Sequence, residues 1–200
     1  MIDKKKQTVE TYNKSAIQMA RKFSSLGARY ADIKQACDLC KKKNLKVVEL
    51  GCGNGRDAAE ILKFTNDYLG IDISRSMIEI AKKTTPKARF EVADLESFEF
   101  EKGIDIIFAF AALLHSKKED LKKMFLRATK ALNSNGLFFI SLKFGKYREF
   151  SKDDEFGTRT YYYYTPEDIE KIAGKSYKTI FKTVHTLRGQ KWFEIILRKI

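Results

Sequence analysis

The sequence predicts an α/β fold in which a doubly wound, mostly parallel sheet lies between two layers of helices. Between residues 45 and 143, short apolar segments alternate with segments of helical period, which is the pattern of repeated strand–helix–strand units. Residues 104–110 are almost entirely apolar, as expected for a strand buried on both faces. Two more apolar segments flank Arg188-Gly189 near the end. We therefore expect a three-layer α/β/α sandwich that ends in an antiparallel hairpin.

The first 143 residues supply most of the expected elements. Apolar residues recur at helical spacing over 5–23 and 29–42, and the second segment ends in lysines and Asn44, so both are predicted helices. Ser74 is of the type that caps a helix, and residues 133–136 form a turn before the last parallel strand. The predicted strands are 45–50, 68–71, 89–93, 104–110 and 137–143, and the predicted helices between them are 57–64, 74–83 and 121–132.

The pattern changes after residue 145. A polar stretch, 145–158, precedes Arg159, Thr160 and four consecutive tyrosines. Thr165 and Pro166 have the residue types of an N-cap and a first helical turn. Strands over 178–184 and 192–198 would form the final hairpin. We divide this single domain into a helical N-terminal lid (1–43), a core (45–143), an insert (145–164) and a C-terminal helix and hairpin (165–200).

Composition limits the class of protein. The chain has 200 residues, of which 44% are apolar and 32% charged, which suits one domain with a buried core. It has no run of about 18 apolar residues, so we expect no membrane span. The first residues, M-I-D-K-K-K-Q-T, lack the apolar centre of a signal peptide. Three cysteines read as reduced thiols, so a cytoplasmic location is expected.

Two further features bear on ligands. Cys37 and Cys40 form C-D-L-C without a second pair, and we interpret them as thiols on a helix, with no metal site expected. The formal net charge is +13, and such a charge attracts polyanions, including nucleic acid. The lysines are nevertheless scattered along the chain without one basic stripe. A solvated surface and an RNA partner both remain open.

Residues 47–56 read V-V-E-L-G-C-G-N-G-R. A strand followed by glycines and a helix lets a ligand lie against bare backbone. A nicotinamide dinucleotide fingerprint would need glycine where Arg56 stands, which disfavours that cofactor. Asp72 ends the next strand and Asp94 follows the one after. An acid in the position of Asp72 accepts the hydroxyls of a ribose, at the sheet edge where open α/β folds bind ligands.

This ordered set resembles the class I S-adenosylmethionine-dependent methyltransferases, Rossmann-like enzymes, of the broad type 11/25 kind. The resemblance covers residues 45–143. It implies that the core binds S-adenosylmethionine, that S-adenosylhomocysteine is the product, and that no metal takes part. On this basis the insert would lie on the substrate side.

Roles for single residues follow from the same resemblance. Gly51 and Gly53 would pass under the methionine part of the cofactor, and Asp72 would bind its ribose. Asp94 would accept from the adenine amine, beside the backbone N–H of Leu95. Phe110 would flank the transferring methyl group. The remaining cofactor candidates are Ile73 and Met77, which would pack on the adenine, and Glu49, Cys52 and Arg56, in or next to the glycine loop.

The acceptor side carries weaker signals. His115 follows the fourth strand, and its ordinary pKa near neutrality makes it the candidate catalytic base, although a histidine that braces the turn fits equally. Alternate tyrosines of a strand share a face, so either Tyr161 and Tyr163, or Tyr162 and Tyr164, would face the acceptor. The substrate candidates are Tyr12, on the lid, with Lys143, Arg159, Tyr161 and Tyr163.

Several acceptors remain open. Our leading interpretation is methyl transfer to oxygen or nitrogen of a small polar metabolite. Residues 160–163 and Lys191-Trp192 partly match enzymes that methylate carboxymethyl-uridine at the tRNA wobble position, so tRNA is an alternative. A protein or peptide acceptor and a non-catalytic cofactor-binding protein are further ones. The Asn/Asp-Pro-Pro-aromatic motif of enzymes that methylate amino groups of DNA bases is missing after residue 110, so DNA is not expected. We expect a monomer or homodimer.

Overall fold

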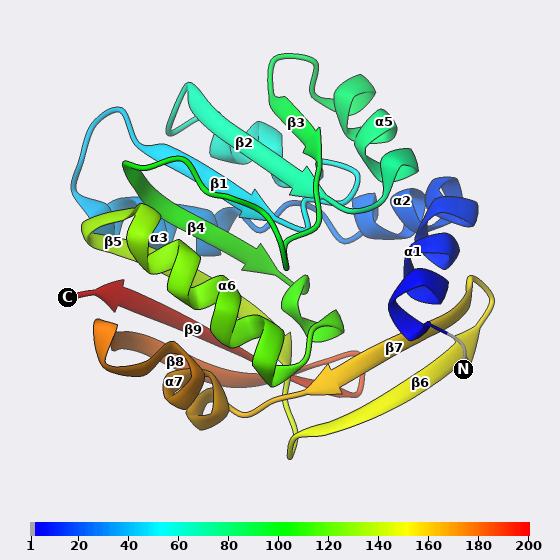
Figure 1. The fold of residues 1–200 in the computed structure, drawn as a ribbon. Helices are drawn as coiled ribbons and strands as arrows, with labels where there is room; N and C mark the ends of the chain where they lie inside the picture. Colours follow the sequence, from blue (N-terminus) through cyan, green and yellow to red (C-terminus); the bar gives the residue numbers. More distant parts are fainter. Residues whose placement is uncertain (1–2) are drawn as a thin grey trace.

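The computed structural model describes residues 3–200 and has a seven-stranded sheet at its centre (Figure 1). The strand order is β3-β2-β1-β4-β5-β9-β8. The first five strands of the chain run parallel, whereas β9 is antiparallel to both β5 and β8. This confirms the predicted fold class. The strands are β1 (Lys46–Leu50), β2 (Asp67–Asp72), β3 (Arg89–Val92), β4 (Ile104–Phe110), β5 (Leu132–Lys143), β8 (Tyr177–Leu187) and β9 (Gln190–Lys199).

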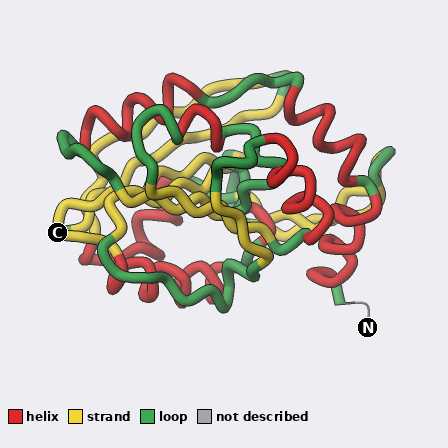
Figure 2. Tube along the Cα trace, turned by 90° about the horizontal axis from the view of Figure 1, so that it is seen from above, coloured by secondary structure: helices red, strands yellow, loops and turns green. Residues whose placement is uncertain are grey.

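Helices cover both faces of this sheet, as the view from above shows (Figure 2). On one face, α3 (Tyr30–Cys40), α4 (Ala58–Ile61) and α5 (Arg75–Thr84) bury apolar side chains against the strands. On the other, α6 (Lys118–Ala131) and α7 (Pro166–Ala173) do the same. The short 3₁₀ turns η1 (Leu113–His115) and η2 (Gly174–Ser176) follow β4 and α7. With both faces of the sheet covered by these two apolar layers, the edge at which the parallel strands end remains open to a ligand.

Two helix starts agree with the sequence. The Ser74 hydroxyl accepts a hydrogen bond from the Met77 backbone N–H, as expected for an N-cap. Thr165 and Asp168 form a reciprocal capping box at the start of α7. The predicted turn at 133–136 is instead the start of β5, with a register shift where this strand pairs with β4.

The N-terminal segment differs from the prediction of one helix over 5–23. It forms α1 (Lys4–Lys14) and α2 (Ala16–Ser24), because the chain leaves helical geometry at Ser15. The Ser15 hydroxyl donates to the carbonyl oxygen of Phe156, which is 141 residues away. A contact distant in sequence thus accompanies the break.

A second, two-stranded sheet was not predicted. Strands β6 (Arg148–Asp154) and β7 (Gly157–Tyr163) form an antiparallel hairpin beside α1, at the lower right of Figure 1. Strand β6 exposes most of its polar side chains, so it lacks the apolar alternation that indicates a strand. Within residues 3–200, no helix combines the length and apolar character needed to cross a membrane.

Candidate functional site

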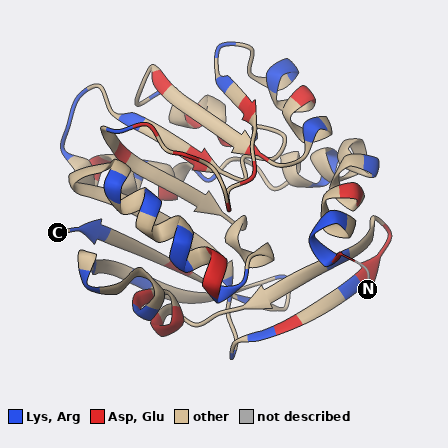
Figure 3. Cartoon of the chain, viewed as in Figure 1, with Lys and Arg blue, Asp and Glu red and all other residues tan. Residues whose placement is uncertain are grey.

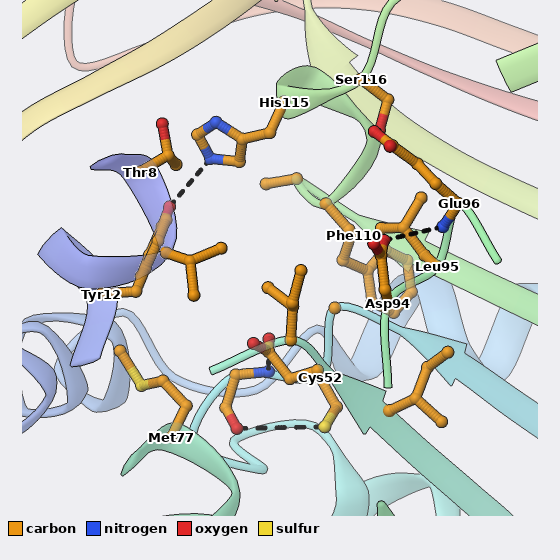
Figure 4. A pocket seen from close by; sticks show the side chains of 18 of the residues that line it. Thr8, Tyr12, Cys52, Met77, Asp94, Leu95, Glu96, Phe110, His115 and Ser116 are labelled. Carbon is orange, nitrogen blue, oxygen red and sulfur yellow. Dashed lines mark hydrogen bonds between the residues drawn. The ribbon is translucent and has the colours of Figure 1, made fainter. Parts of the chain in front are cut away.

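A cavity of about 780 Å³ lies at the carboxyl ends of the parallel strands, under α1 and β7 (Figure 4). The loops that follow β1, β2, β3 and β4 supply one wall, and α1 with the hairpin supplies the other. The structure therefore brings together residues that the sequence separates by more than a hundred positions. All eleven cofactor candidates line it: Glu49, Gly51, Cys52, Gly53, Arg56, Asp72, Ile73, Met77, Asp94, Leu95 and Phe110.

Asp72 joins the glycine loop to the end of β2. Its Oδ2 accepts from the backbone N–H of Gly53 at 2.9 Å, and its Oδ1 accepts from that of Ser74 at 2.8 Å. Burial raises the pKa of this carboxyl, although these backbone donors oppose the shift. The carboxylate is thereby fixed in position at the cavity wall, where it can accept further hydrogen bonds.

Two more acids lie below the glycine loop. Glu49 is only 2% exposed, and its Oε2 accepts from the Tyr68 hydroxyl at 2.6 Å. Asp57 is buried, ion-paired with Arg56 at 2.7 Å. Burial, followed by the negative charge of Asp57, raises the pKa of Glu49 to about 8. This part of the cavity therefore holds more acid than base.

The loop after β3 contacts the lid directly. Asp94 Oδ1 accepts from the Glu96 backbone N–H at 3.0 Å, while Oδ2 accepts from the Lys5 ammonium at 2.6 Å. Lys5 also forms an ion pair with Glu96. Met77, which also lines the cavity, packs with Ala16 and Met19 of α2. Lys5 was not among the predicted site residues, because one lysine among many in the sequence carries no sign that it will pair with Asp94 and Glu96.

His115 and Tyr12 meet across the cavity (Figure 4). The Nδ1–H of His115 donates to the carbonyl oxygen of Thr160 at 2.6 Å, which leaves Nε2 as the acceptor for the Tyr12 hydroxyl at 3.0 Å. Burial lowers the pKa of His115 to about 4, and it raises that of Tyr12. The imidazole is therefore neutral at pH 7, with its free nitrogen pair on the Tyr12 side.

The other four substrate candidates lie outside the residues that line the cavity. Arg159 is ion-paired with Asp154 at 2.6 Å. The Tyr161 ring stands behind His115, with centroids 4.8 Å apart, and Lys143 lies over that ring at 4.1 Å. Tyr163 stacks on Phe150. These side chains support the hairpin and His115 from outside the cavity.

The opposite face of β7 supplies the lining instead. Thr160 and Tyr162 line the cavity, in keeping with the alternation of a strand. The sequence left open which pair of tyrosines faces the acceptor, and of these four only Tyr162 lines the cavity. Tyr164 is buried, and its hydroxyl donates to the Ser116 carbonyl. Thr8, Glu149 and Trp192 also line the cavity, and only the pairing of α1, β6 and β9 with distant segments places them there.

The cavity and the protein surface differ in charge. Eight acidic side chains line the cavity, against four lysines and arginines. Lysines and arginines instead recur along α5 and α6 (Figure 3), where most of them are exposed. Among the described residues, no three histidine, cysteine or carboxylate side chains gather in a way that could hold a metal ion.

A comparison with known proteins finds a family whose model matches part of this chain. Residues 47–136 match the profile of a family described as "Methyltransferase domain". The chain is 30% identical over 139 residues to the phosphoethanolamine N-methyltransferase of Plasmodium falciparum, covering 67% of this chain and 52% of that protein. It is 30% identical over 103 residues to the ubiquinone biosynthesis O-methyltransferase of Pelagibacter ubique, covering 50% and 42%. The chain thus spans about half the length of these curated relatives.

Solved structures share the fold at low identity. Magnesium protoporphyrin IX methyltransferase from Synechocystis PCC 6803, solved with bound S-adenosylmethionine, superposes with a TM-score of 0.76 and 16% identity, covering 100% of this chain and 99% of that one. A methyltransferase from Clostridium acetobutylicum gives a TM-score of 0.71 and 15% identity, covering 85% and 90%.

Proposed function

We propose that this chain is a class I S-adenosylmethionine-dependent methyltransferase that methylates oxygen or nitrogen of a small polar metabolite. The match of residues 47–136 to a methyltransferase domain supports the first part of this proposal. One observation carries the proposal. Acids at the carboxyl ends of β1 and β2, the acid that follows β3, and the neutral His115 after β4 line a single cavity. Relatives that share its sequence include an O-methyltransferase and an N-methyltransferase, which leaves the atom methylated open.

The residues present suit the cofactor chemically. S-adenosylmethionine, when bound, supplies a methyl group on a cationic sulfonium. Asp72 and Asp94 offer carboxylate oxygens for its ribose and adenine amine, and the acidic Glu49 side suits its ammonium. A Cβ on Gly53 would meet no atom within 4 Å, so the bare backbone there leaves room for a ligand.

His115 and Tyr12 would prepare the acceptor. The neutral imidazole can take a proton at Nε2, either directly or through the Tyr12 hydroxyl that now occupies it. A base with a pKa of about 4 is adequate, because an oxygen or nitrogen becomes strongly acidic as it gains a methyl group. The backbone carbonyl of Thr160 keeps the ring in the tautomer that this step needs.

The charge of the cavity bears on the acceptor class. A wall with eight acids and four basic side chains favours neutral or cationic molecules over polyanions. The cavity volume of about 780 Å³ must also hold the cofactor, which leaves space for a small molecule. Both features support a small metabolite rather than a tRNA nucleotide with its phosphates.

Methyl transfer can be followed without knowing the acceptor. The purified protein would be incubated with S-adenosylmethionine tritiated on its methyl group and a deproteinised cell extract, and the products would be separated into small-molecule and RNA fractions. We expect label among small molecules. Label that nuclease removes from the RNA fraction would contradict our proposal in favour of tRNA. Label in neither fraction, with cofactor binding intact, would contradict it in favour of a protein acceptor or a non-catalytic domain.

Matched variants test the cofactor site itself. Replacing Asp72 by Ala removes the carboxylate at the cavity, and we expect calorimetric binding of S-adenosylmethionine to weaken by about 100-fold or more, as for loss of a charged hydrogen-bonding group. Asp67→Ala, at the exposed opposite end of β2, should bind as the wild type does. Equal loss in both variants would indicate damage to the strand rather than to a binding site.

A further inference from the structure

The acids around the glycine loop differ in the number and charge of the hydrogen-bond donors that reach their carboxylate oxygens. Asp57 Oδ1 accepts a hydrogen bond from the backbone N–H of Arg29 at 2.8 Å, and the Arg56 guanidinium donates to both Asp57 oxygens, at 3.2 Å and 2.7 Å. Asp72 likewise has a backbone N–H on each oxygen. Glu49 has one neutral donor, the Tyr68 hydroxyl on Oε2, and in the described part of the chain no hydrogen bond reaches its Oε1.

Glu49 is also the most enclosed of these acids that line the cavity. It is 2% exposed, yet it belongs to the cavity wall. A buried carboxylate without a cationic partner or N–H donors is costly, and the neutral acid is the cheaper form. Arg56, the cation of this region, is already held by Asp57. The geometry therefore leaves Glu49 without a counter-charge of its own.

We propose that Glu49 holds a proton in the ligand-free protein and gives it up when the ammonium of the bound amino acid end arrives, so that cofactor binding releases a proton. This inference rests on the proposed function, because S-adenosylmethionine is the ligand that brings the ammonium. It makes Glu49 the residue that distinguishes ligands with an amino acid end from adenosine derivatives without one.

The charges around Glu49 agree with this proposal. Burial raises its pKa to about 8, and Asp57 and Asp72 add to the rise, whereas the Tyr68 hydroxyl and Arg56 oppose it. Cys52, whose pKa burial raises well above its ordinary value, contributes no charge at neutral pH. The groups around Glu49 do not neutralise a negative charge on its side chain. An ammonium beside Glu49 would do so, and would therefore favour the ionised carboxylate over the neutral acid.

The sign of the pH effect follows from this exchange. Below pH 8 the free protein carries the proton and the complex does not, so affinity should rise with pH, by up to about tenfold per pH unit. The α-amino group of the ligand must itself be protonated to bind. Affinity should therefore rise to a maximum at about pH 8 or above, and fall once this group also loses its proton.

Calorimetry in two buffers measures the proton directly. Titrations at pH 7 in phosphate and in Tris, which differ in their heat of ionisation, give the number of protons released. We expect between about one half and one proton for S-adenosylmethionine and S-adenosylhomocysteine. We expect almost none for 5′-methylthioadenosine, which has the same nucleoside and no amino acid end.

The variant Glu49→Gln keeps a neutral side chain of the same shape. It should release almost no proton, bind S-adenosylmethionine at least about tenfold more weakly at pH 8, and bind 5′-methylthioadenosine as the wild type does. Tyr68→Phe removes a donor to the carboxylate and should move the affinity maximum to higher pH. Equal heats in both buffers with intact binding would overturn this inference alone. No binding of S-adenosylmethionine to the wild type would overturn the proposed function, and this inference with it.

Discussion

Burial of His115 has a consequence for stability that can be measured without any substrate. The folded protein holds this imidazole neutral down to a pKa of about 4, whereas the unfolded chain takes up a proton near pH 6.5. As the pH falls through that window, the unfolded state binds the extra proton and the folded state does not. The free energy of unfolding therefore decreases towards low pH.

This window gives a prediction for His115→Gln, whose amide can keep both hydrogen bonds. As the pH falls from 6.5 to 4, the free energy of unfolding of the wild type should decrease by up to about 1.4 kcal/mol per pH unit more than that of the variant. His185→Gln, on β8, is the matched control, because the chain has only these two histidines. Urea unfolding at a series of pH values measures the difference. Parallel curves for wild type and His115→Gln would refute the buried neutral histidine.

Two glycines of one loop separate a packing role from a binding role. Both have positive φ, +66° at Gly51 and +53° at Gly53, so alanine at either site carries a backbone cost of about 1–2 kcal/mol. A Cβ on Gly51 would lie 2.4 Å from the Cβ of Ala112, whereas one on Gly53 meets nothing within 4 Å. Their alanine variants should therefore fail in different ways.

We expect Gly51→Ala to lose about 2 kcal/mol more stability than Gly53→Ala, because the contact with Ala112 is overpacked. Gly53→Ala should stay folded and bind S-adenosylmethionine more weakly, since its new methyl group enters the cavity. Denaturant unfolding and calorimetry of both variants test this. Equal unfolding free energies would show that the loop after β4 yields to the methyl group without cost.

At the scale of elements, α1 and the β6–β7 hairpin form one wall. Thr8 Oγ1 accepts from the Thr160 backbone N–H at 3.0 Å, and Thr11 Oγ1 donates to the Thr158 carbonyl at 2.8 Å. Across the cavity, Lys5 reaches Asp94 and Glu96. The lid is thus fastened to the hairpin by hydrogen bonds and to the β3 side by ion pairs.

The ion pairs of Lys5 lead to a prediction about the rate at which the cofactor dissociates. Lys5 is partly exposed, so each pair contributes about 0.5–1 kcal/mol at most. Lys5→Ala should speed dissociation of S-adenosylmethionine several-fold and raise hydrogen exchange of α1 amides. Lys6→Ala, the exposed neighbour on the same helix, is the control. Identical dissociation rates in stopped-flow measurements of both variants would exclude this role of Lys5.

The elements also show how far the sequence alone could lead. The strand over 104–110 and the helix begun by Ser74 were predictable, because burial and capping leave local signals. The break at Ser15 was not predictable, because the partner of its hydroxyl lies more than a hundred residues away. Strand β6 was not predictable either, because its sequence has no alternation of apolar and polar residues. In the site, the strand-end acids were found, whereas Thr8 and Glu149 enter only through the pairing of α1 with the hairpin.

At the scale of the whole molecule, a basic surface encloses an acidic cavity. The formal net charge of +13 predicts binding of polyanions to the outside. Labelled tRNA should therefore bind with an affinity that falls steeply as salt rises from about 50 to 200 mM. Saturating S-adenosylhomocysteine should leave that affinity unchanged in fluorescence anisotropy. Affinity that resists salt and responds to the cofactor would favour RNA as the acceptor.

The hydrogen bond between Thr8 and Thr160 joins residues 152 positions apart. During synthesis, α1 therefore leaves the ribosome long before the hairpin that holds it exists. The core of β1 to β5 has its contacts available earlier, and long-range contacts of this kind slow folding. The cavity should consequently be the last part of the protein to form, and until then Thr8 and Thr11 of α1 lack the hydrogen-bond partners that β7 supplies.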